Sequence, residues 1–532
     1  MLRSQFFIYS LFIFVFLSSL RHFCFWAYLW QLKEYRWSRM KEELLRNHRI
    51  IPWKIIAVAG FIFSLAFGAP YFFNILAPVY FFLGGLYSIF RAAQTKWALP
   101  KKFTMKIILI LWLSVVGWGA LFLLDYSSWL MAILAVDILM PLWAAVAVGL
   151  VEIPVSIIKR YVIKQAKKKR EEQKNLTVIG ITGSYGKTSV KKFLDILLQY
   201  QSGQDKILTT SGHVNTEIGI AQTILKDLKP THRFFICEMG AYRRGEIRKD
   251  SQIIQPKIGI LTGINEQHLA LFGSLKNTIQ AKTELIQALP PDGVGIFNGD
   301  NQYVKKIYQT SQKTKRYATV KSSDRSADLQ AEDIKISKEH LFFKITDGKL
   351  SLSLHLPLAG KENIINILLA SLAVRELGLS LPNIQKCLQS YNFTAFQKIH
   401  HQHGLDIINA TYSTNPNSFL ADLEHLKLWS GKKIVVTPGI IELGSAAHRL
   451  HQEIGEKLAE TADLIIFTRN YYLESVRTGI EKRQLAQKQS SKAQLIYLSR
   501  PSAIVQKVKQ YTQPEDAVLL EGRLPRSIIE NL

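Results

Sequence analysis

Residues 177–189 read TVIGITGSYGKTS, and this stretch decides the fold of the region that follows it. A β-branched strand runs into a turn that contains Gly183 and Gly186, and a helical pattern begins at Lys187 and Thr188. Glycines let backbone N–H groups close around phosphate oxygens, and the N-terminus of a helix favours an anion. The lysine can neutralise terminal phosphates, and the threonine hydroxyl can hold Mg²⁺. We therefore predict a phosphate loop that binds a nucleotide.

The spacing of this loop departs from the strict phosphate-loop pattern, which would place glycine where this chain has Ile181. Gly180 lies one residue early. The alternative interpretation is a tight turn that carries a surface lysine. That interpretation does not explain why glycine, lysine and threonine all fall where a phosphate needs them, so we prefer nucleotide binding.

The first 160 residues differ in composition from the rest of the chain. The chain has 532 residues and a formal net charge of +26, which predicts two or more domains. Long apolar runs at 6–30, 55–90, 107–124 and 129–157 alternate with short basic loops. The run at 55–90 is too long for one span of about 20 residues and suggests a hairpin of two spans. We expect an α-helical membrane domain with five spans.

Basic residues in the loops at 31–54 and 91–106, and after residue 158, set the orientation that we expect. By the positive-inside rule these segments lie in the cytoplasm, which predicts a multi-pass protein of the inner (plasma) membrane with its remaining domains cytoplasmic. The charge favours anionic membrane lipids over nucleic acid. Asp137 lies inside the last run and is either a functional carboxylate or one satisfied by a neighbouring helix. Three scattered cysteines without metal-ligand spacing indicate a reducing compartment.

Strands and helices alternate from about residue 176, as in an α/β domain with a mainly parallel sheet. A strand at 234–237 ends in Glu238, and a carboxylate at the carboxyl end of such a strand is where an open α/β sheet holds Mg²⁺. The strand at 258–261 is followed by His268, which is as often an ordinary loop residue as a site residue. A helix at 277–289 carries Lys282.

These segments together resemble the Mur ligases, the ATP-dependent enzymes that form amide bonds in peptidoglycan synthesis, and in particular the branch that adds D-alanyl-D-alanine. The resemblance covers roughly residues 176–532 and depends on the order of a series of short motifs. The motifs lie at residues 182–188, 215–219, 238–241, 245–247, 268, 272–274, 281–284, 298–300, 360–363, 366, 412, 415–416 and 442–444.

The resemblance implies a reaction in two steps. A substrate carboxylate attacks the γ-phosphate of ATP, and an amine then attacks the acyl phosphate, with catalysis by positioning and charge neutralisation. Lys187, His268 and Lys282 would be the catalytic residues. Thr188 and Glu238 would bind one Mg²⁺, and His268 would help to bind a second. Lys282 matches a lysine that is carbamylated in several family members and so becomes an anionic metal ligand; without the resemblance we would interpret it as a solvated helix residue.

The resemblance also implies which residues contact the two substrates. The predicted nucleotide contacts are Gly183, Ser184, Gly186, Lys187, Thr188, Ser189, Asn298, Asn366 and Lys398. Asn215, Thr216 and Asn415 match positions on the acceptor side. The partners would be a cell-wall precursor, as a lipid-linked or a UDP-linked muropeptide, and an amino acid or dipeptide.

Several residues in the C-terminal part depart from the family pattern. Ala410 replaces an aspartate that helps to seat the nucleotide, and Lys398 is the nearest counterpart of an arginine that reaches the γ-phosphate. The usual Arg-His pair of one motif is Lys361-Glu362 here, and Glu521 stands where a lysine is usual. A lysine keeps the charge of arginine but loses its bidentate fork. Slow turnover, an altered substrate and loss of ligase activity all stay open.

We expect four segments: a transmembrane domain at 1–160, a basic linker at 161–175, a central ATP-binding domain at 176–392 and a C-terminal domain at 393–532. The domain that grips UDP in these ligases has no room before the phosphate loop, which favours a lipid-linked acceptor. Two alternative functions are an ATP-driven transporter and an ATP-binding scaffold. An ATP-driven transporter would need more polar residues within the spans than Asp137, and an ATP-binding scaffold that recruits wall enzymes stays open because of Ala410.

Overall fold

The computed structural model describes residues 24–32, 35, 40, 104–119, 126–212, 214–321, 323–396, 398–402, 404–411, 414–487 and 493–532. The chain divides into two compact units, Met1–Tyr161 and Val162–Leu532, which we describe separately. The boundaries of the four segments that the sequence suggests stay a prediction.

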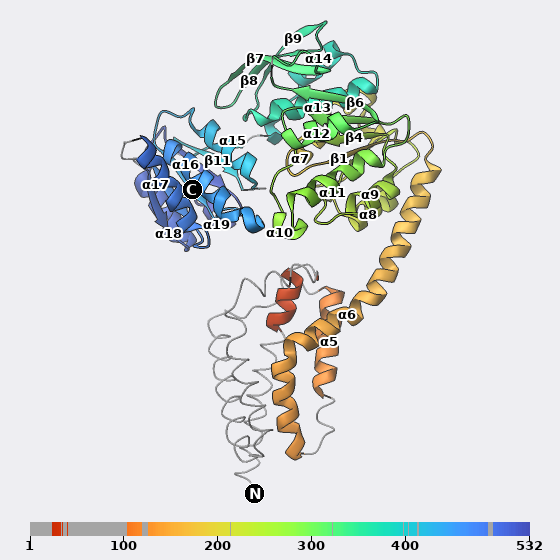
Figure 1. Cartoon of the computed structure of the whole chain (residues 1–532), viewed down its shortest axis with the longest axis vertical. Coiled ribbons are helices and arrows are strands. Elements are labelled where there is room, and N and C mark those ends of the chain that lie inside the picture. The colour runs from red at the N-terminus through yellow and green to blue at the C-terminus, as the bar shows by residue number, and fades with distance from the viewer. Residues whose placement is uncertain are drawn as a thin grey trace. The chain divides into compact units, whose positions relative to one another are not determined.

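The described part of the first unit consists mainly of α5 (Met105–Gly119) and the first part of α6 (Tyr126–Glu172) (Figure 1). Among the described residues, no helix is both long enough and apolar enough to cross a membrane. With 15 residues, α5 is about 22 Å long, which is shorter than a hydrocarbon core of about 30 Å. Where the side chains of α6 are described, they include Glu152 and, from Lys159 onward, a series of basic residues.

The predicted five-span membrane domain and the multi-pass location are therefore wrong for the residues that the structure describes. Residues 6–23 of the predicted span at 6–30 and the whole of 55–90 lie outside the described residues, as does the side chain of Asp137. The sequence interpretation took apolar composition as evidence for spans. Crossing a bilayer requires an apolar helix of sufficient length, because every backbone polar group must be satisfied within the helix.

The second unit begins with a nine-stranded sheet of order β2-β3-β1-β4-β5-β6-β7-β8-β9 (Figure 1). The strands from β2 to β7 pair in parallel, and β7, β8 and β9 pair antiparallel. The strands are β1 (Thr177–Thr182), β2 (Ile207–Thr209), β3 (Phe234–Glu238), β4 (Ile258–Leu261), β5 (Val294–Asn298), β6 (Thr314–Thr319), β7 (Leu329–Ile336), β8 (Leu341–Thr346) and β9 (Ser351–Leu356). The predicted α/β domain with a mainly parallel sheet is confirmed.

Helices pack on both faces of this sheet. On α7 the buried residues Val190, Phe193, Leu194 and Leu197 follow the i, i+3, i+4, i+7 spacing of one helix face, and they join a core with α13 and α14. The opposite face is covered by α8, α9, α11 and the end of α6. The helices are α7 (Lys187–Ser202), α8 (Glu217–Asp227), α9 (Glu246–Ile254), α10 (Leu269–Phe272), α11 (Leu275–Gln287), α12 (Gln302–Thr310), α13 (Glu362–Glu376) and α14 (Leu381–Ser390).

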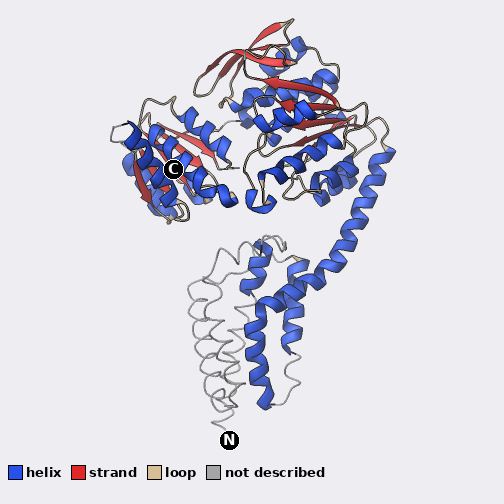
Figure 2. Cartoon of the chain, in the orientation of Figure 1, coloured by secondary structure: helices blue, strands red, loops and turns tan. Residues whose placement is uncertain are grey.

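A second, six-stranded sheet of order β10-β11-β15-β12-β13-β14 follows, in which only the edge strand β10 is antiparallel to its neighbour. It is also enclosed by helices (Figure 2). The strands are β10 (Ile399–Gln402), β11 (Leu405–Ala410), β12 (Lys433–Thr437), β13 (Leu464–Phe467), β14 (Gln494–Tyr497) and β15 (Ala517–Glu521). The helices are α15 (Pro416–Leu426), α16 (Ala447–Thr461), α17 (Leu473–Gln487), α18 (Pro501–Tyr511) and α19 (Arg526–Ile529).

Candidate functional site

The phosphate loop joins the end of β1 to the start of α7, as the sequence predicts. A Cβ atom on Gly183 would lie 2.0 Å from Oγ1 of Thr262. Gly186 has φ 81°, and a Cβ atom there would lie 2.7 Å from Oδ1 of Asn366. Only glycine therefore fits at either position. The close approach also places Asn366, from α13, beside the loop, in keeping with its predicted nucleotide contact.

Three further residues of the predicted nucleotide site lie on the loop or in the first turn of α7. Nζ of Lys187 donates a hydrogen bond to the carbonyl oxygen of Gly183 at 2.8 Å, so its ammonium group lies over the loop. Burial lowers the pKa of Lys187, and the charge of Glu238 opposes this shift. The backbone N–H of Ser184 donates to the carbonyl of Gly263 at 2.6 Å, and Ser189 lies in the first turn of α7.

Glu238, the last residue of β3, is the centre of the polar contacts beside the loop. Oγ1 of Thr188 donates to its Oε2 at 2.9 Å, and Nζ of Lys191 lies 3.3 Å from the same oxygen. Nδ2 of Asn215 donates to Oε1 at 3.4 Å, and Thr216 follows as the N-cap of α8. The carboxylate is only 3% exposed, yet it is paired with a cation and two neutral donors.

Lys191 is a site residue that the sequence interpretation missed. Its Nζ also donates to the carbonyl oxygens of Thr210 at 2.8 Å and Gly212 at 3.1 Å. The available signal was its spacing, because a residue four positions after Lys187 lies on the same face of a helix. We refer to Lys187, Thr188, Lys191 and Glu238 as the phosphate-loop cluster.

His268 lies in the loop after β4 and contacts a residue from the C-terminal domain. Its Nδ1 is 2.5 Å from Oε2 of Glu442, and its ring packs edge-on against Tyr242 with centroids 4.8 Å apart. Burial lowers the pKa of His268, and Glu442 opposes that shift. The backbone N–H of Ala270 also donates to the carbonyl of Glu442. Glu442 belongs to a quoted motif, but the sequence interpretation assigned it no role.

Lys282, on α11, is buried with 4% exposure. Burial, and then the charge of Lys187, lower its pKa to about 7, against the opposing effect of nearby carboxylates. The alternative interpretation as a solvated helix residue is therefore wrong. An amine with this pKa is partly neutral at physiological pH, and the neutral form is the nucleophilic one.

The residues beside the loop fit one Mg²⁺ ion. Thr188 and Glu238 bring a hydroxyl and a carboxylate together, and Mg²⁺ in phosphate sites needs only one or two protein carboxylates because phosphates and water complete its shell. Within the described residues, no group of three or more His, Cys, Asp and Glu side chains forms a metal cluster. The roles of His268 and Lys282 at a second ion stay predictions.

Asn298, at the end of β5, is fixed by its neighbours. Its Nδ2 donates to the carbonyl of Thr262 at 2.6 Å, and its Oδ1 accepts from the N–H of Asp300 at 2.9 Å. These bonds tie the ends of β4 and β5 together beside the phosphate loop. The contact of Asn298 with a nucleotide base stays a prediction.

Asn415 joins the region of the six-stranded sheet to that of the nine-stranded sheet, and its side chain is already hydrogen-bonded within the protein. Its Oδ1 accepts from Nδ2 of Asn265 at 2.9 Å and also caps α15, where Ser418 completes a capping box. Its predicted substrate contact stays untested. Tyr412 of the same motif lies outside the described residues.

Lys398, which was predicted to contact the γ-phosphate, lies among carboxylates. Its Nζ is 2.8 Å from Oε1 of Glu362 and 3.4 Å from Oδ1 of Asp422. Burial would lower the pKa of Lys398, but the two carboxylates outweigh burial and raise it. Its positive charge is therefore already paired inside the protein, and contact with the γ-phosphate would require these pairs to rearrange.

Glu521 extends this group of charges. Its side chain is fully buried, with the side chains of Asp422 and Thr414 as its polar neighbours. Burial, and then the neighbouring Asp422, raise its pKa well above the ordinary value. Ala410 is its register partner on the adjacent strand β11. We refer to Glu362, Lys398, Asp422 and Glu521 as the four-charge cluster; it brings together residues at which the sequence departs from the Mur pattern.

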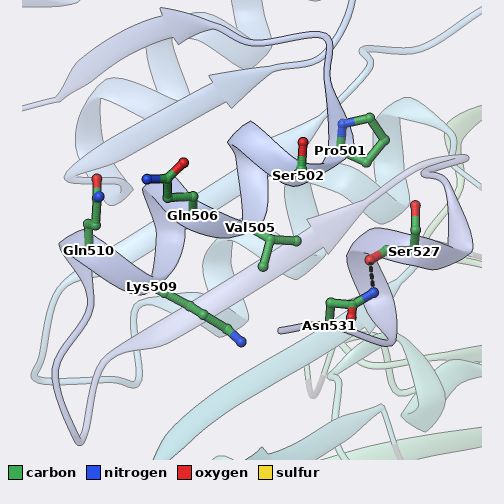
Figure 3. Close-up of a pocket in the computed structure, with 8 residues that line it drawn as sticks. All are labelled: Pro501, Ser502, Val505, Gln506, Lys509, Gln510, Ser527 and Asn531. Atoms are coloured by element: carbon green, nitrogen blue, oxygen red, sulfur yellow. Dashed lines mark hydrogen bonds between the residues drawn. The ribbon is translucent and has the colours of Figure 1, made fainter.

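The C-terminal domain also contains a cavity of about 600 Å³ between α18 and α19 (Figure 3). Lys509 is the one charged residue in its lining, and Asn531 donates to the carbonyl of Ser527 at 2.7 Å at one side. None of the candidate site residues lies on these two helices, so we do not assign this cavity to the site.

Comparisons with known proteins agree with this geometry. Residues 181–374 match the Mur ligase middle domain, and residues 396–524 match the Mur ligase glutamate ligase domain. The chain is 28% identical over 364 residues to the UDP-N-acetylmuramoyl-tripeptide–D-alanyl-D-alanine ligase of Bacillus subtilis, covering 68% of this chain and 76% of that protein. The ligase of the same name from Haemophilus influenzae is 28% identical over 313 residues, which is 58% of this chain and 67% of the relative.

A solved structure shows the same similarity. MurF from Acinetobacter baumannii superposes with a TM-score of 0.61 and 25% identity, covering 70% of this chain and 79% of that one. The fold and the phosphate-loop cluster, with these matches, define an ATP-dependent enzyme that joins an acid to an amine through a carbon–nitrogen bond. The chain belongs to the Mur ligase family.

Proposed function

We propose that this chain is a MurF-like ligase that joins a dipeptide of the D-alanyl-D-alanine type to the terminal carboxyl group of a muramoyl peptide. The observation that carries the proposal is the convergence of Lys187, Thr188 and Glu238 at the carboxyl edge of the sheet. The names of the relatives from Bacillus subtilis and Haemophilus influenzae support the substrate class. We keep 176–392 as the ATP-binding domain and 393–532 as the amine-side domain.

In this mechanism the chain's own residues act mainly by positioning. Lys187 neutralises charge on the β- and γ-phosphates of ATP while the substrate carboxylate attacks the γ-phosphorus. An acyl phosphate forms and ADP leaves. The amine then attacks the acyl carbon, loses a proton and expels phosphate. Mg²⁺ held by Thr188 and Glu238 would neutralise phosphate charge, and Lys191 keeps the Glu238 carboxylate in place.

Lys282 is proposed to act as a carbamate. Its pKa of about 7 gives it the neutral amine that must attack CO₂, forming an N–C bond and releasing one proton. The product would be an anion beside the metal site. A ¹³C signal of a carbamate, observed after equilibration with ¹³CO₂ in the wild type and absent from Lys282→Arg, tests this role. A signal that is unchanged in the variant rules it out.

The ligase activity itself is tested with the purified full-length chain, ATP, Mg²⁺, D-alanyl-D-alanine and a muramoyl tripeptide acceptor. Phosphate release and product mass are followed together. The proposal requires phosphate release that depends on both substrates, with a matching increase in mass. The acceptor is supplied separately in UDP-linked and lipid-linked form, and the ratio of the two rates decides which form the enzyme uses.

The second candidate function is an ATP-binding scaffold without ligase activity. The specific observation in its favour is the altered C-terminal region, where Ala410 removes a usual carboxylate and Glu521 places a buried carboxyl group beside Asp422. Binding of ATP to the wild type but not to Lys187→Ala, with no turnover for any acceptor and amine pair, would support the scaffold and contradict the ligase.

A further inference from the structure

A cavity of about 1020 Å³ lies at the amino-terminal edge of the nine-stranded sheet. Its walls are formed by the end of α6, the C-terminal turns of α9 and α11, and the residues that lead into β1 and β4. The volume is within the upper range for small-molecule sites. We call this cavity the basic pocket, because its basic lining residues are Lys167, Arg170, Lys174, Arg248 and Lys257.

The positive charge of the basic pocket is only partly balanced. Lys257 pairs with Asp292, and Lys167 lies 3.9 Å from Glu171. Glu284 is the acidic residue in the lining, and its two oxygens already accept backbone hydrogen bonds from Gly245 at 2.7 Å and Arg248 at 3.0 Å. No ion pair of the side chains of Lys174 and Arg248 is found within the described residues. The pocket therefore keeps a net positive charge.

Arg170 lies at the back of this pocket with 8% exposure. Its Nε donates to the carbonyl oxygen of Ile254 at 2.8 Å, and its Nη atoms donate to the carbonyls of Gln173, Leu176 and Gln255 at 3.3–3.4 Å. These acceptors are neutral. Arginine stays protonated in proteins, so a guanidinium charge is fixed here without a hydrogen-bonded carboxylate. The charge of Glu171 opposes the effect of burial on the pKa of Arg170, and the guanidinium adds to the positive potential of the pocket.

Ser251 gives a second, independent indication of a ligand. It lines the pocket from α9 with 3% exposure, and its Oγ has no hydrogen-bond partner among the described residues. Leaving a buried hydroxyl unpaired costs about 1–3 kcal/mol. An acceptor oxygen on a bound molecule would satisfy this donor.

The basic pocket is separate from the catalytic site. Thr177, the first residue of β1, lines the pocket, whereas Thr182 at the other end of the strand leads into the phosphate loop. The strand spans about 17 Å at 3.3 Å per residue. The phosphates of an ATP molecule in the loop therefore do not reach the pocket.

We propose that the basic pocket binds a phosphate-bearing small molecule, with its phosphate oxygens at Arg248, Lys174 and the hydroxyl of Ser251. Phosphate suits these donors because each oxygen accepts several charge-assisted hydrogen bonds from flexible basic side chains. The volume admits a molecule of nucleotide size beyond the phosphate. The site lies between the end of α6 and the ATP-binding domain, and it does not depend on the ligase activity.

The test uses inorganic pyrophosphate as the probe, titrated calorimetrically into the full-length Lys187→Ala protein in EDTA. This background removes the lysine of the phosphate loop and the metal, so that binding at the loop is suppressed. We expect saturable binding that weakens with added salt. Introducing Lys174→Ala and Arg248→Ala together into the Lys187→Ala protein should raise the Kd for pyrophosphate about tenfold or more, because two charge-assisted contacts are lost.

A matched control replaces Arg325 and Lys349, two exposed basic residues outside the pocket, with alanine in the same background. The control should bind pyrophosphate as tightly as its parent. Ser251→Ala should weaken binding while leaving thermal stability unchanged or higher, which a purely structural serine would not do. Absence of saturable binding in the Lys187→Ala background, or equal losses in the pocket and control variants, overturns the proposal.

Discussion

At the phosphate loop one buried carboxylate, Glu238, is surrounded by a lysine, a hydroxyl and an amide, whereas around Lys398 two buried carboxylates, Asp422 and Glu521, and the half-buried Glu362 share one lysine. Both clusters come from several elements of the second unit. The first has donors matched to its single negative charge. The second has more carboxylates than its lysine can neutralise, and the fully buried Glu521 lies beside another carboxyl group, that of Asp422.

This difference teaches that burial alone does not mark a site that is ready for chemistry. In the phosphate-loop cluster Glu238 is paired with Lys191, and Mg²⁺ would take a share of the Glu238 charge on binding with ATP. The four-charge cluster must keep protons on some of its carboxylates, because burial and mutual repulsion raise the pKa of Asp422 and Glu521. Its charge state therefore depends on pH.

The largest effect is expected at the phosphate loop. Lys187→Ala should lower the rate of ATP-dependent phosphate release by about 100- to 1000-fold, because a preorganised cation at the transferring phosphate is lost. Lys192→Ala, an exposed neighbour on α7, is the control and should change the rate less than about threefold. Equal rates in Lys187→Ala and the wild type would show that the chemistry does not depend on this loop.

Removal of the lysine from the four-charge cluster should cause the largest loss of stability. Lys398→Met should lower the free energy of unfolding by about 2–3 kcal/mol, because Asp422 and Glu521 are then buried without a nearby cation, whereas Glu362 is 31% exposed and keeps part of its hydration. Urea denaturation measures this change, and Mg²⁺ should not reverse it. Adding Glu521→Gln to Lys398→Met should recover part of the loss, and a double variant no more stable than the single one contradicts the shared cluster.

The same removal at the phosphate-loop cluster should behave differently. Lys191→Met leaves Glu238 unpaired and should lower the free energy of unfolding by about 1–3 kcal/mol. Here the loss should be reduced by Mg²⁺ with ADP, which supplies a replacement cation beside Glu238. If Mg²⁺ and ADP stabilise Lys398→Met and Lys191→Met by the same amount, the proposed contrast between the clusters is wrong.

A smaller, pH-dependent effect is expected at Glu521. The folded protein holds the pKa of Glu521 above its unfolded value, so the unfolded chain loses the proton first and wild-type stability falls as pH rises above the unfolded pKa. Glu521→Gln removes this dependence. It should be more stable than the wild type by about 1 kcal/mol at pH 8, and the advantage should vanish near pH 4. Parallel stability curves across this range would contradict the raised pKa.

Local patterns predicted the elements that carry the phosphate-loop half of the candidate site. The strand, the glycine turn and the helix from 177 to 198 are continuous in sequence, and Glu238 and His268 follow strands whose ends meet at one edge of a parallel sheet. The structure places Thr188 on Glu238 as this topology requires. Lys191 was missed because its role depends on which face of α7 meets β3.

The rest depends on contacts between residues far apart in sequence. Glu362, Lys398 and Glu521 lie on three separate elements, and nothing in their local sequence indicates that they meet. The contact of Glu442 with His268 is of the same kind. The membrane prediction failed for a different reason, because runs of apolar residues were equated with spans, and the described helices do not provide them.

The pairing of Ala410 with Glu521 across β11 and β15 has a consequence for how this protein could be changed. The Mur pattern usually has an aspartate at the first position and a lysine at the second, so a pair that is usually neutral carries one ionisable carboxyl group and no cation here. Ala410→Asp by itself would place a new carboxylate beside Glu521 and should lower the free energy of unfolding relative to the wild type. Only the paired reversion, Ala410→Asp with Glu521→Lys, avoids that penalty, so in genetic terms the two positions are epistatic.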